Sequence, residues 1–148
     1  MNPYRELSLL LRISRLFDIY RRQQMRKTDL YPALLTCVGH VCRNPGSSQK
    51  DIAQSVCVDK TTMAHHMAKL EEKGYIERRP SPEDRRISLI YPTEKALALE
   101  PMLHETYVAF YENLLRDFSP EERAQIGPLA ERLFLAARRS VEEDGISK

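Results

Sequence analysis

The sequence predicts a mostly α-helical fold that carries one small β-hairpin. Apolar residues recur every three or four positions over most of the chain, which is the period of an amphipathic helix. A period of two occurs only after Gly74, and turn residues divide the chain into short segments. A chain of 148 residues is long enough to form one hydrophobic core of its own.

The first two predicted helices cover the N-terminal part of the chain. Between Tyr4 and Gln24, one helical face is defined by Leu9, Ile13, Leu16, Phe17 and Tyr20. Pro32 suits the first turn of a second helix, because its ring presets the backbone angle φ and its missing N–H would have no helical partner there. The turn residues 44–46 are expected to end this helix.

Two short helices joined by a tight turn are predicted next. Ser48 is expected to cap the first of them, and Asp51 lies in its first turn, where a negative charge suits the helix dipole. The second is expected from Lys60 to Lys73, with Gly74 directly after its end. Together the two segments predict a helix-turn-helix.

The second helix of this pair has two chemically different faces. On a helical wheel, Met67 and Leu70 lie within about 40° of Met63, so these three residues form the buried side. The opposite side carries Thr61, His65, Ala68 and Lys69. His66 lies at the edge of the buried side and is expected to be a partly buried packing residue, whereas His65 points outward.

A β-hairpin is predicted after the helix-turn-helix. Tyr75–Glu77 begins the first strand, and Arg78–Arg86 is the expected charged loop. The return strand shows Ile87, Leu89 and Tyr91 alternating with Ser88 and Ile90 before Pro92. This strand is therefore expected to place its odd-numbered residues on one face of the sheet.

Two long helices are predicted after the hairpin. Thr93 can cap the first, which extends to about Asp117 with a kink or interruption at Pro101. Ser119 and Pro120 form a start signal for the last helix. Its apolar side is formed by Ile126, Leu129, Leu133, Phe134, Ala137 and Val141. The apolar faces at both ends of the chain can be buried on the central module or on a second copy of the chain.

Charge is distributed unevenly along the chain. The net charge is only +2, which is a weak indication of nucleic-acid binding. However, residues 1–30 hold seven Lys and Arg against three Asp and Glu, whereas residues 96–148 hold six against ten. A DNA-binding surface would therefore depend on local clusters of positive charge.

Several features predict a soluble, cytoplasmic protein. Arginines interrupt the apolar residues between Met1 and Tyr20, unlike the apolar block of a secretory signal, and no apolar run approaches the roughly 20 residues of a membrane span. The three cysteines are Cys37, Cys42 and Cys57. Their spacing does not predict a metal site, and buried, reduced thiols are favoured over a redox-sensing role, which stays open.

Four motifs resemble those of the MarR family of winged helix-turn-helix regulators. They are Ser48–Ala53, Val58–Thr62, Lys69–Arg78 and the hairpin sequence Asp84–Thr93. The resemblance covers essentially the whole chain, and its specific part runs from residue 48 to residue 96. Within the hairpin motif, a family Val is replaced by Ile, and a family Leu is replaced by Pro92, which departs from the pattern.

The resemblance implies a function and a division of the chain. Residues 31–96 would form the winged DNA-binding region, while residues 1–30 and 97–148 would form a helical dimerisation region. The expected protein is a homodimeric transcriptional regulator without membrane association, with a repressor favoured over an activator. Its partner would be double-stranded DNA with a pseudo-palindromic operator whose half-sites lie about 10 base pairs apart.

The predicted DNA contacts lie on the helix-turn-helix and the hairpin. They are Ser48, Gln49, Lys60, Thr61, Thr62, His65, Lys69, Asp84, Arg85 and Arg86. Hydroxyl and ammonium groups suit phosphate oxygens, and threonine methyl groups also suit thymine. Asp84 can orient Arg86, leaving Arg85 or Arg86 to enter the narrow minor groove, and the resemblance favours Arg86. The alternative is that these arginines only solvate a loop.

Members of the family commonly change their DNA affinity when a small aromatic ligand binds between the dimerisation helices and the winged module. The resemblance makes Arg15, Tyr31 and His40 candidate ligand contacts, although packing or surface roles fit them as well. The alternative is a redox-sensing regulator. Redox-sensing members of the family use a reactive cysteine near the N-terminus, but no cysteine precedes Cys37 in this chain. Cys37 and His40 are one helical turn apart, yet no oxyanion-binding loop accompanies them, so no catalytic site, cofactor or metal is expected.

Overall fold

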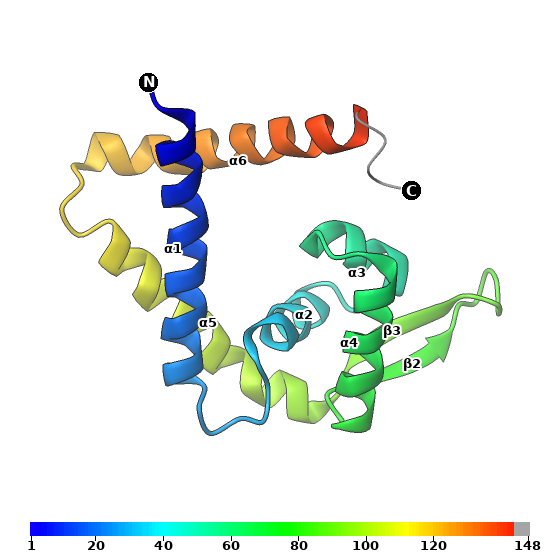
Figure 1. The fold of residues 1–148 in the computed structure, drawn as a ribbon. Helices are drawn as coiled ribbons and strands as arrows, with labels where there is room; N and C mark the ends of the chain where they lie inside the picture. The colour runs from blue at the N-terminus through cyan, green and yellow to red at the C-terminus, as the bar shows by residue number, and fades with distance from the viewer. Residues whose placement is uncertain (144–148) are drawn as a thin grey trace. The chain divides into compact units, whose positions relative to one another are not determined.

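The computed structural model describes residues 1–143, which form six helices and three short strands. The chain divides into two compact units, residues 1–110 and residues 111–148. Within the first unit, Figure 1 shows the helix-turn-helix beside a two-stranded hairpin that projects away from it. No helix in the described part of the chain is long and apolar enough to cross a membrane. The fold is mostly helical with a small sheet, as the sequence predicts.

The first two helices begin and end as predicted. Helix α1 (Pro3–Gln24) starts with the Asn2 side chain accepting a hydrogen bond from the backbone N–H of Arg5 at 3.2 Å. Helix α2 (Pro32–Arg43) has Pro32 at its first turn. Both helices thus use proline where a helix leaves its N–H groups without internal partners.

The helix-turn-helix consists of α3 (Gln49–Val56) and α4 (Lys60–Glu72). The Ser48 hydroxyl oxygen accepts a hydrogen bond from the backbone N–H of Asp51 at 3.1 Å, which confirms Ser48 as the cap of α3. Cys57 ends α3 in the left-handed conformation, with φ at 57°. This conformation turns the chain sharply, so that α4 can begin three residues later.

A three-stranded antiparallel sheet follows the order β1-β3-β2. Strands β2 (Ile76–Pro80) and β3 (Ser88–Pro92) form the predicted hairpin, and β1 (Ser47–Ser48) pairs with the other edge of β3. Strand β1 was not expected from the sequence, because two residues are too few to show a period of two. It connects the start of α3 directly to the hairpin.

The structure corrects the start of the predicted hairpin loop and shows which face of β3 is buried. Residues 78–80 belong to β2 and pair with residues 88–90, so the loop begins three residues later than expected. Ile90 is fully buried whereas its strand neighbours Leu89 and Tyr91 are only half-buried, so the face of β3 that carries Ile90 points inward. Apolar residues occupy both phases of this strand, and only packing against the helices determines which phase is buried.

The core of the first unit lies between α2, α3, α4 and the sheet. Its fully buried side chains include Leu34, Leu35, Val38, Val41, Ile52, Met63, Met67, Leu70 and Ile90. The three α4 residues in this set are those predicted from the helical wheel. His66 is more deeply buried than expected, with 7% of its surface exposed.

The two C-terminal helices are α5 (Glu94–Leu114) and α6 (Pro120–Glu143). Helix α5 continues through Pro101 without interruption and ends three residues before the predicted Asp117. A proline inside a helix removes only one backbone hydrogen bond, which the rest of a long helix can tolerate. The Ser119 hydroxyl accepts from the N–H of Glu122 at 3.2 Å, so the predicted start of α6 is confirmed.

The apolar faces of the long helices stay largely uncovered in the described chain. Helix α1 exposes Leu7, Leu9, Leu10, Leu11, Ile13, Leu16 and Ile19. Helix α5 exposes Leu97, Met102, Tyr107, Val108, Tyr111 and Leu114, and α6 exposes Leu129, Leu133, Phe134, Leu135 and Val141. These exposed sets are far larger than the scattered apolar residues of an ordinary protein surface.

Candidate nucleic-acid interface

The outer face of α4 presents polar groups to solvent. Lys60, Thr61 and His65 are exposed, whereas Met63 and Met67 on the opposite face have no exposed surface. The buried face therefore anchors α4 against the core and leaves the outer face available for contact. A helix presented in this way has the dimensions that the major groove of DNA accepts.

Thr62 has a different position from its neighbour Thr61. Its hydroxyl group donates to the Asp59 carboxylate at 2.7 Å, and its backbone N–H donates to the same carboxylate at 2.9 Å. These hydrogen bonds lower the pKa of Asp59 below its ordinary value. The Thr62 hydroxyl proton is thus engaged in capping α4, while the side chains of Lys60 and Thr61 are exposed in the same turn.

Two neighbouring histidines of α4 have opposite surroundings. His65 is exposed, whereas the Nδ1 atom of His66 lies 3.2 Å from the hydroxyl oxygen of Tyr31, at hydrogen-bond distance. Burial, followed by electrostatic interaction with His65, lowers the pKa of His66. The Lys69 ammonium lies 5.4 Å from the centre of the Tyr31 ring. Tyr31, at the start of α2, therefore holds two residues of α4.

The N-terminus of α3 is joined to the sheet by side chains. Gln49 accepts a hydrogen bond through Oε1 from Nη1 of Arg78 at 3.1 Å, and Nε of Arg78 donates to Glu71 at 2.6 Å. Gln49 belongs to α3, Glu71 to α4 and Arg78 to β2. The predicted contact residues at the start of α3 are thereby linked to the other two elements of the interface.

The hairpin tip carries the predicted Asp84–Arg86 pair. Nε and Nη2 of Arg86 each donate to the Asp84 carboxylate at 3.0 Å, and the Arg86 backbone N–H donates at 3.1 Å. These bonds lower the pKa of Asp84 and raise that of Arg86. The Arg86 side chain is nevertheless 90% exposed, and Arg85 is also exposed. The hairpin thus presents an oriented guanidinium to the surroundings.

The base of the hairpin is stabilised by an aromatic contact. The Arg79 guanidinium lies 4.3 Å from the centre of the Tyr91 ring, a favourable cation–π geometry. Gly46 lies against the same tyrosine in the left-handed region with φ at 84°, and an added Cβ atom would come within 3.1 Å of the Tyr91 hydroxyl oxygen. A side chain at position 46 would be both strained and crowded. These contacts hold the hairpin in a defined direction.

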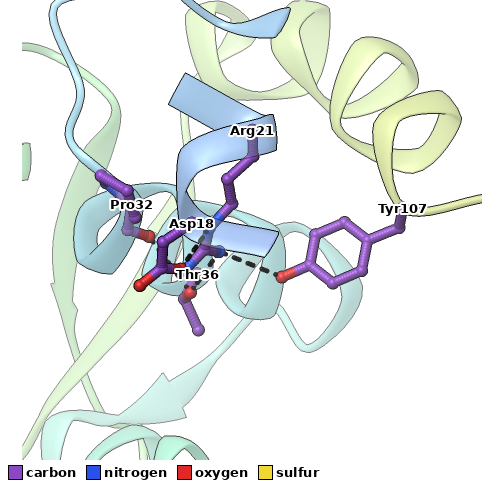
Figure 2. A network of polar contacts seen from close by, with 5 residues as sticks. All are labelled: Asp18, Arg21, Pro32, Thr36 and Tyr107. Carbon is purple, nitrogen blue, oxygen red and sulfur yellow. Dashed lines mark hydrogen bonds and ion pairs between the residues drawn. The ribbon is translucent and has the colours of Figure 1, made fainter. Parts of the chain in front are cut away.

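A buried arginine connects α1, α2 and α5 (Figure 2). Nη1 of Arg21 donates to the hydroxyl oxygens of Thr36 at 2.8 Å and Tyr107 at 3.3 Å. Its Nη2 and Nε donate to Asp18 at 2.7 and 3.0 Å. The Thr36 hydroxyl in turn donates a hydrogen bond to the backbone oxygen of Pro32 at 3.2 Å. The two bonds from Nη1 therefore join α1 to α2 and α5, while the bonds to Asp18, within α1, hold the guanidinium in place.

Arg21 was not singled out in the sequence, although a signal was present. It follows Phe17 by four residues and Asp18 by three, so it shares the helical face of both. The guanidinium lies 5.0 Å from the centre of the Phe17 ring. An arginine in line with an apolar face can be buried only when acceptors from other elements meet it, and sequence spacing does not show those acceptors.

The predicted ligand contacts lie in separate surroundings. Arg15 is exposed on α1, while Tyr31 contacts His66 and Lys69 as described above. His40 is half-buried near the end of α2, where burial lowers its pKa. A ligand site formed by Arg15, Tyr31 and His40 stays a prediction.

The three cysteines differ in exposure. Cys37 is buried, and burial raises the pKa of its thiol to about 11, which disfavours the reactive thiolate. Cys42 is half-buried and its pKa is also raised. Cys57 is exposed in the turn between α3 and α4. Among the described residues, no group of three or more His, Cys, Asp or Glu side chains is arranged to hold a metal ion.

Comparisons with known proteins agree on one family. A sequence model of the MarR family matches residues 33–88. The chain is 30% identical to the uncharacterised HTH-type transcriptional regulator YybA of Bacillus subtilis, over 89% of this chain and 85% of that protein. It resembles a crystal structure of MarR with a TM-score of 0.78 and 30% identity, covering 92% of both chains. The same fold occurs in Streptococcus pneumoniae FabT, solved in complex with DNA, with a TM-score of 0.78, 21% identity, and coverage of 93% of this chain and 99% of that one.

Proposed function

This chain belongs to the MarR family, and from that premise we propose that it is a homodimeric, cytoplasmic repressor that binds a pseudo-palindromic DNA operator. The observation that carries the proposal is the pairing of two exposed features on one packed module. These are the polar outer face of α4 and the hairpin tip, where Asp84 orients an otherwise exposed Arg86. FabT, which has the same fold, was solved in complex with DNA.

In the proposed complex, α4 enters the major groove. Lys60 and Thr61 would contact phosphates at the start of the helix, and His65 and Lys69 would reach base edges or phosphates along it. Thr62 would act mainly through its bonds to Asp59, which keep the first turn of α4 intact. At the other end of the interface, Arg86 would enter the minor groove, where a narrow groove attracts guanidinium groups.

A second copy of the chain would cover the exposed apolar faces of the long helices. We infer that residues 1–30 and 97–148 form the dimerisation region and residues 31–96 the DNA-binding region. Two-fold symmetry would then place two α4 helices in successive major grooves about 10 base pairs apart. A small aromatic ligand bound near Arg15, Tyr31 or His40 would change this separation.

The DNA contact proposed for the hairpin tip is tested by comparing two neighbouring arginines. Arg86→Ala should weaken binding to a genomic operator fragment by roughly 1–3 kcal/mol, because it removes an oriented contact. Arg85→Ala removes the same charge without disturbing the pair with Asp84, so it should lose less affinity. Fluorescence anisotropy at several salt concentrations measures both effects. Equal losses in the two variants would show that the hairpin contributes only charge.

The redox alternative depends on the one exposed thiol of the described chain, Cys57, which lies in the turn before α4. Peroxide treatment, with and without a reductant, would be followed by operator titration. If affinity is unchanged, thiol sensing is excluded. If affinity falls and the Cys57→Ser variant resists the change, the redox mechanism replaces ligand sensing.

A further inference from the structure

Three polar side chains from three elements form a continuous line in the first unit. Glu71 lies in the last turn of α4, Arg78 on β2, and Gln49 at the first position of α3. Arg78 donates through Nε to Glu71 at 2.6 Å and through Nη1 to Gln49 Oε1 at 3.1 Å. The Arg78 side chain is 30% exposed, so these contacts are partly shielded from water.

The bond from Arg78 determines whether the oxygen or the NH₂ group of the Gln49 amide faces outward. A guanidinium group has five N–H donors and no acceptor, so only the oxygen of an amide can bind it. The Gln49 oxygen is therefore turned toward Arg78, and its NH₂ group is left to donate elsewhere. An amide without such a neighbour could turn over and present either end.

The charge of Arg78 is already balanced by Glu71. A paired guanidinium adds little to the attraction of DNA phosphates, because the adjacent carboxylate cancels most of its field. The neighbouring Arg79 has a different role, since it lies on the Tyr91 ring instead of on Glu71. Successive residues of a strand point to opposite faces, which explains why the two arginines differ.

We propose that Arg78, held by Glu71, is a positioning residue that fixes the Gln49 amide with its NH₂ group toward a phosphate of bound DNA. This inference rests on the DNA-binding function proposed above. It also assigns a chemistry to Gln49. Specific reading of adenine by glutamine presents both the oxygen and the nitrogen of the amide to one base, and here the oxygen is turned toward Arg78. Gln49 therefore contributes affinity and register through its NH₂ group and does not read a base with both ends of the amide.

A mutant cycle on the full-length protein tests this role. Gln49→Leu removes the NH₂ group that is proposed to donate to the phosphate. The double change Glu71→Gln with Arg78→Met removes the bonds of Arg78 to Glu71 and Gln49, which we call the positioning line, without altering net charge. Each should weaken binding to a genomic operator fragment about fivefold, as expected for one hydrogen bond. The triple variant should lose no more affinity than whichever of these two variants loses more, because Arg78 and Glu71 act only through Gln49. Losses that multiply to about 25-fold would overturn the proposal.

The salt dependence of binding distinguishes positioning from direct phosphate contact. The charge-balanced double variant should keep the wild-type slope of affinity against salt concentration. A slope smaller by about one unit would instead mean that Arg78 itself neutralises a phosphate, and the proposal would be wrong. Arg78→Lys keeps the charge but replaces the rigid guanidinium fork with a single flexible ammonium group, so it should lose as much affinity as the double variant. Arg79→Met serves as the matched control and should leave the contribution of Gln49 unchanged.

Nuclear magnetic resonance of the DNA-free protein tests the positioning line separately from DNA binding. The side-chain amide signals of Gln49 should shift in the Glu71→Gln, Arg78→Met variant and stay unchanged in Arg79→Met. If the signals do not shift, the line does not hold the amide, whatever the protein binds. If they shift but the wild-type protein binds no genomic fragment, the positioning line exists and the proposed DNA-binding function is the part that fails.

Discussion

Helices α1 and α2 both have an apolar face, but that of α2 is buried whereas that of α1 is exposed. Of the 12 residues of α2, seven are buried, and they include Leu34, Leu35 and Val38. Of the 22 residues of α1, only Arg21 is buried. The longer helix thus exposes its leucines and buries a charge, whereas the shorter one buries its apolar residues.

This difference shows which part of the chain closes a hydrophobic core without a second chain. The face of α2 is covered by α3, α4 and the sheet, which accounts for one closed core. The face of α1 meets the rest of the first unit largely through the polar junction of Arg21 and the ring contacts of Phe17 with Tyr107 and Phe110. Polar junctions need specific partners, so the Arg21 junction fixes the orientation of α1. The apolar face of the same helix stays available for a second chain.

The largest expected effect is on the closed core. Leu34→Ala should lower the free energy of unfolding by about 2–5 kcal/mol, because it leaves a cavity in a fully buried site. Urea unfolding monitored by circular dichroism measures this loss. Leu10→Ala on the exposed face of α1 is the control at a concentration where the protein is monomeric, and it should cost less than 1 kcal/mol. Equal costs would remove the distinction between the two helices.

A charge on the exposed face of α1 should act on assembly. Leu16→Glu is expected to weaken dimerisation by about 1.5–3 kcal/mol, since it replaces an apolar side chain that the proposed dimer buries. Sedimentation equilibrium measures the dissociation constant. Leu16→Met, which keeps the face apolar, should leave it nearly unchanged. A wild-type protein that stays monomeric at all concentrations would contradict the proposed dimer.

Removing the polar junction should have an intermediate effect. Arg21→Met is expected to cost about 1–2 kcal/mol of unfolding free energy, because Thr36 and Asp18 lose a buried donor. Tyr107→Phe removes only the longest of the bonds and should cost less. Thermal unfolding of both variants measures the order. If Tyr107→Phe costs as much as Arg21→Met, the bond to the Tyr107 hydroxyl group accounts for most of the junction's contribution, and the bonds to Thr36 and Asp18 add little.

The smallest expected effect is a pH dependence of stability. Burial lowers the pKa of His66 in the folded protein below the value of about 6.5 that an unfolded chain has. Below pH 6.5 the unfolded state therefore binds more protons, and the free energy of unfolding falls as the pH drops toward the folded pKa. The stabilising contribution is complete above about pH 6.5. Burial shifts His40 in the same direction, so it adds to this loss.

Urea unfolding at pH 7.5 and pH 5.5 measures this dependence. His66→Gln should reduce the difference between the two conditions and leave the part that belongs to His40. An unchanged difference would show that His66 does not titrate in this range. Tyr31→Phe removes the hydroxyl at 3.2 Å from the His66 ring but keeps the imidazole, so it separates the hydrogen bond from burial.

Much of the fold follows from local signals. The cap at Ser48, the turn at Gly74 and the start signal at Ser119 are confirmed because a capping side chain or a left-handed residue acts on its own neighbours in the chain. The Asp84–Arg86 pair is confirmed for the same reason, since its members are only two positions apart in the chain.

Other features could not be predicted because their partners lie far along the chain. Strand β3 has apolar residues in both phases, and only its packing shows that Ile90 is the buried one. The link from Arg78 to Gln49 crosses 29 positions, and the bond from Arg21 to Tyr107 crosses 86. Neither pair has a spacing that a helix or strand would repeat.

The sequence by itself determined the order of the helices and of the hairpin, the caps at Ser48 and Ser119, and the family to which the chain belongs, because each depends on residues close together in the chain. Only the tertiary structure decided which apolar faces the chain buries itself and which arginines lie inside. Burial and pairing are properties of a location in space, where segments distant in sequence meet and exclude water. For this reason Arg21 is enclosed between helices while Arg86, also paired with an aspartate, stays exposed at the hairpin tip.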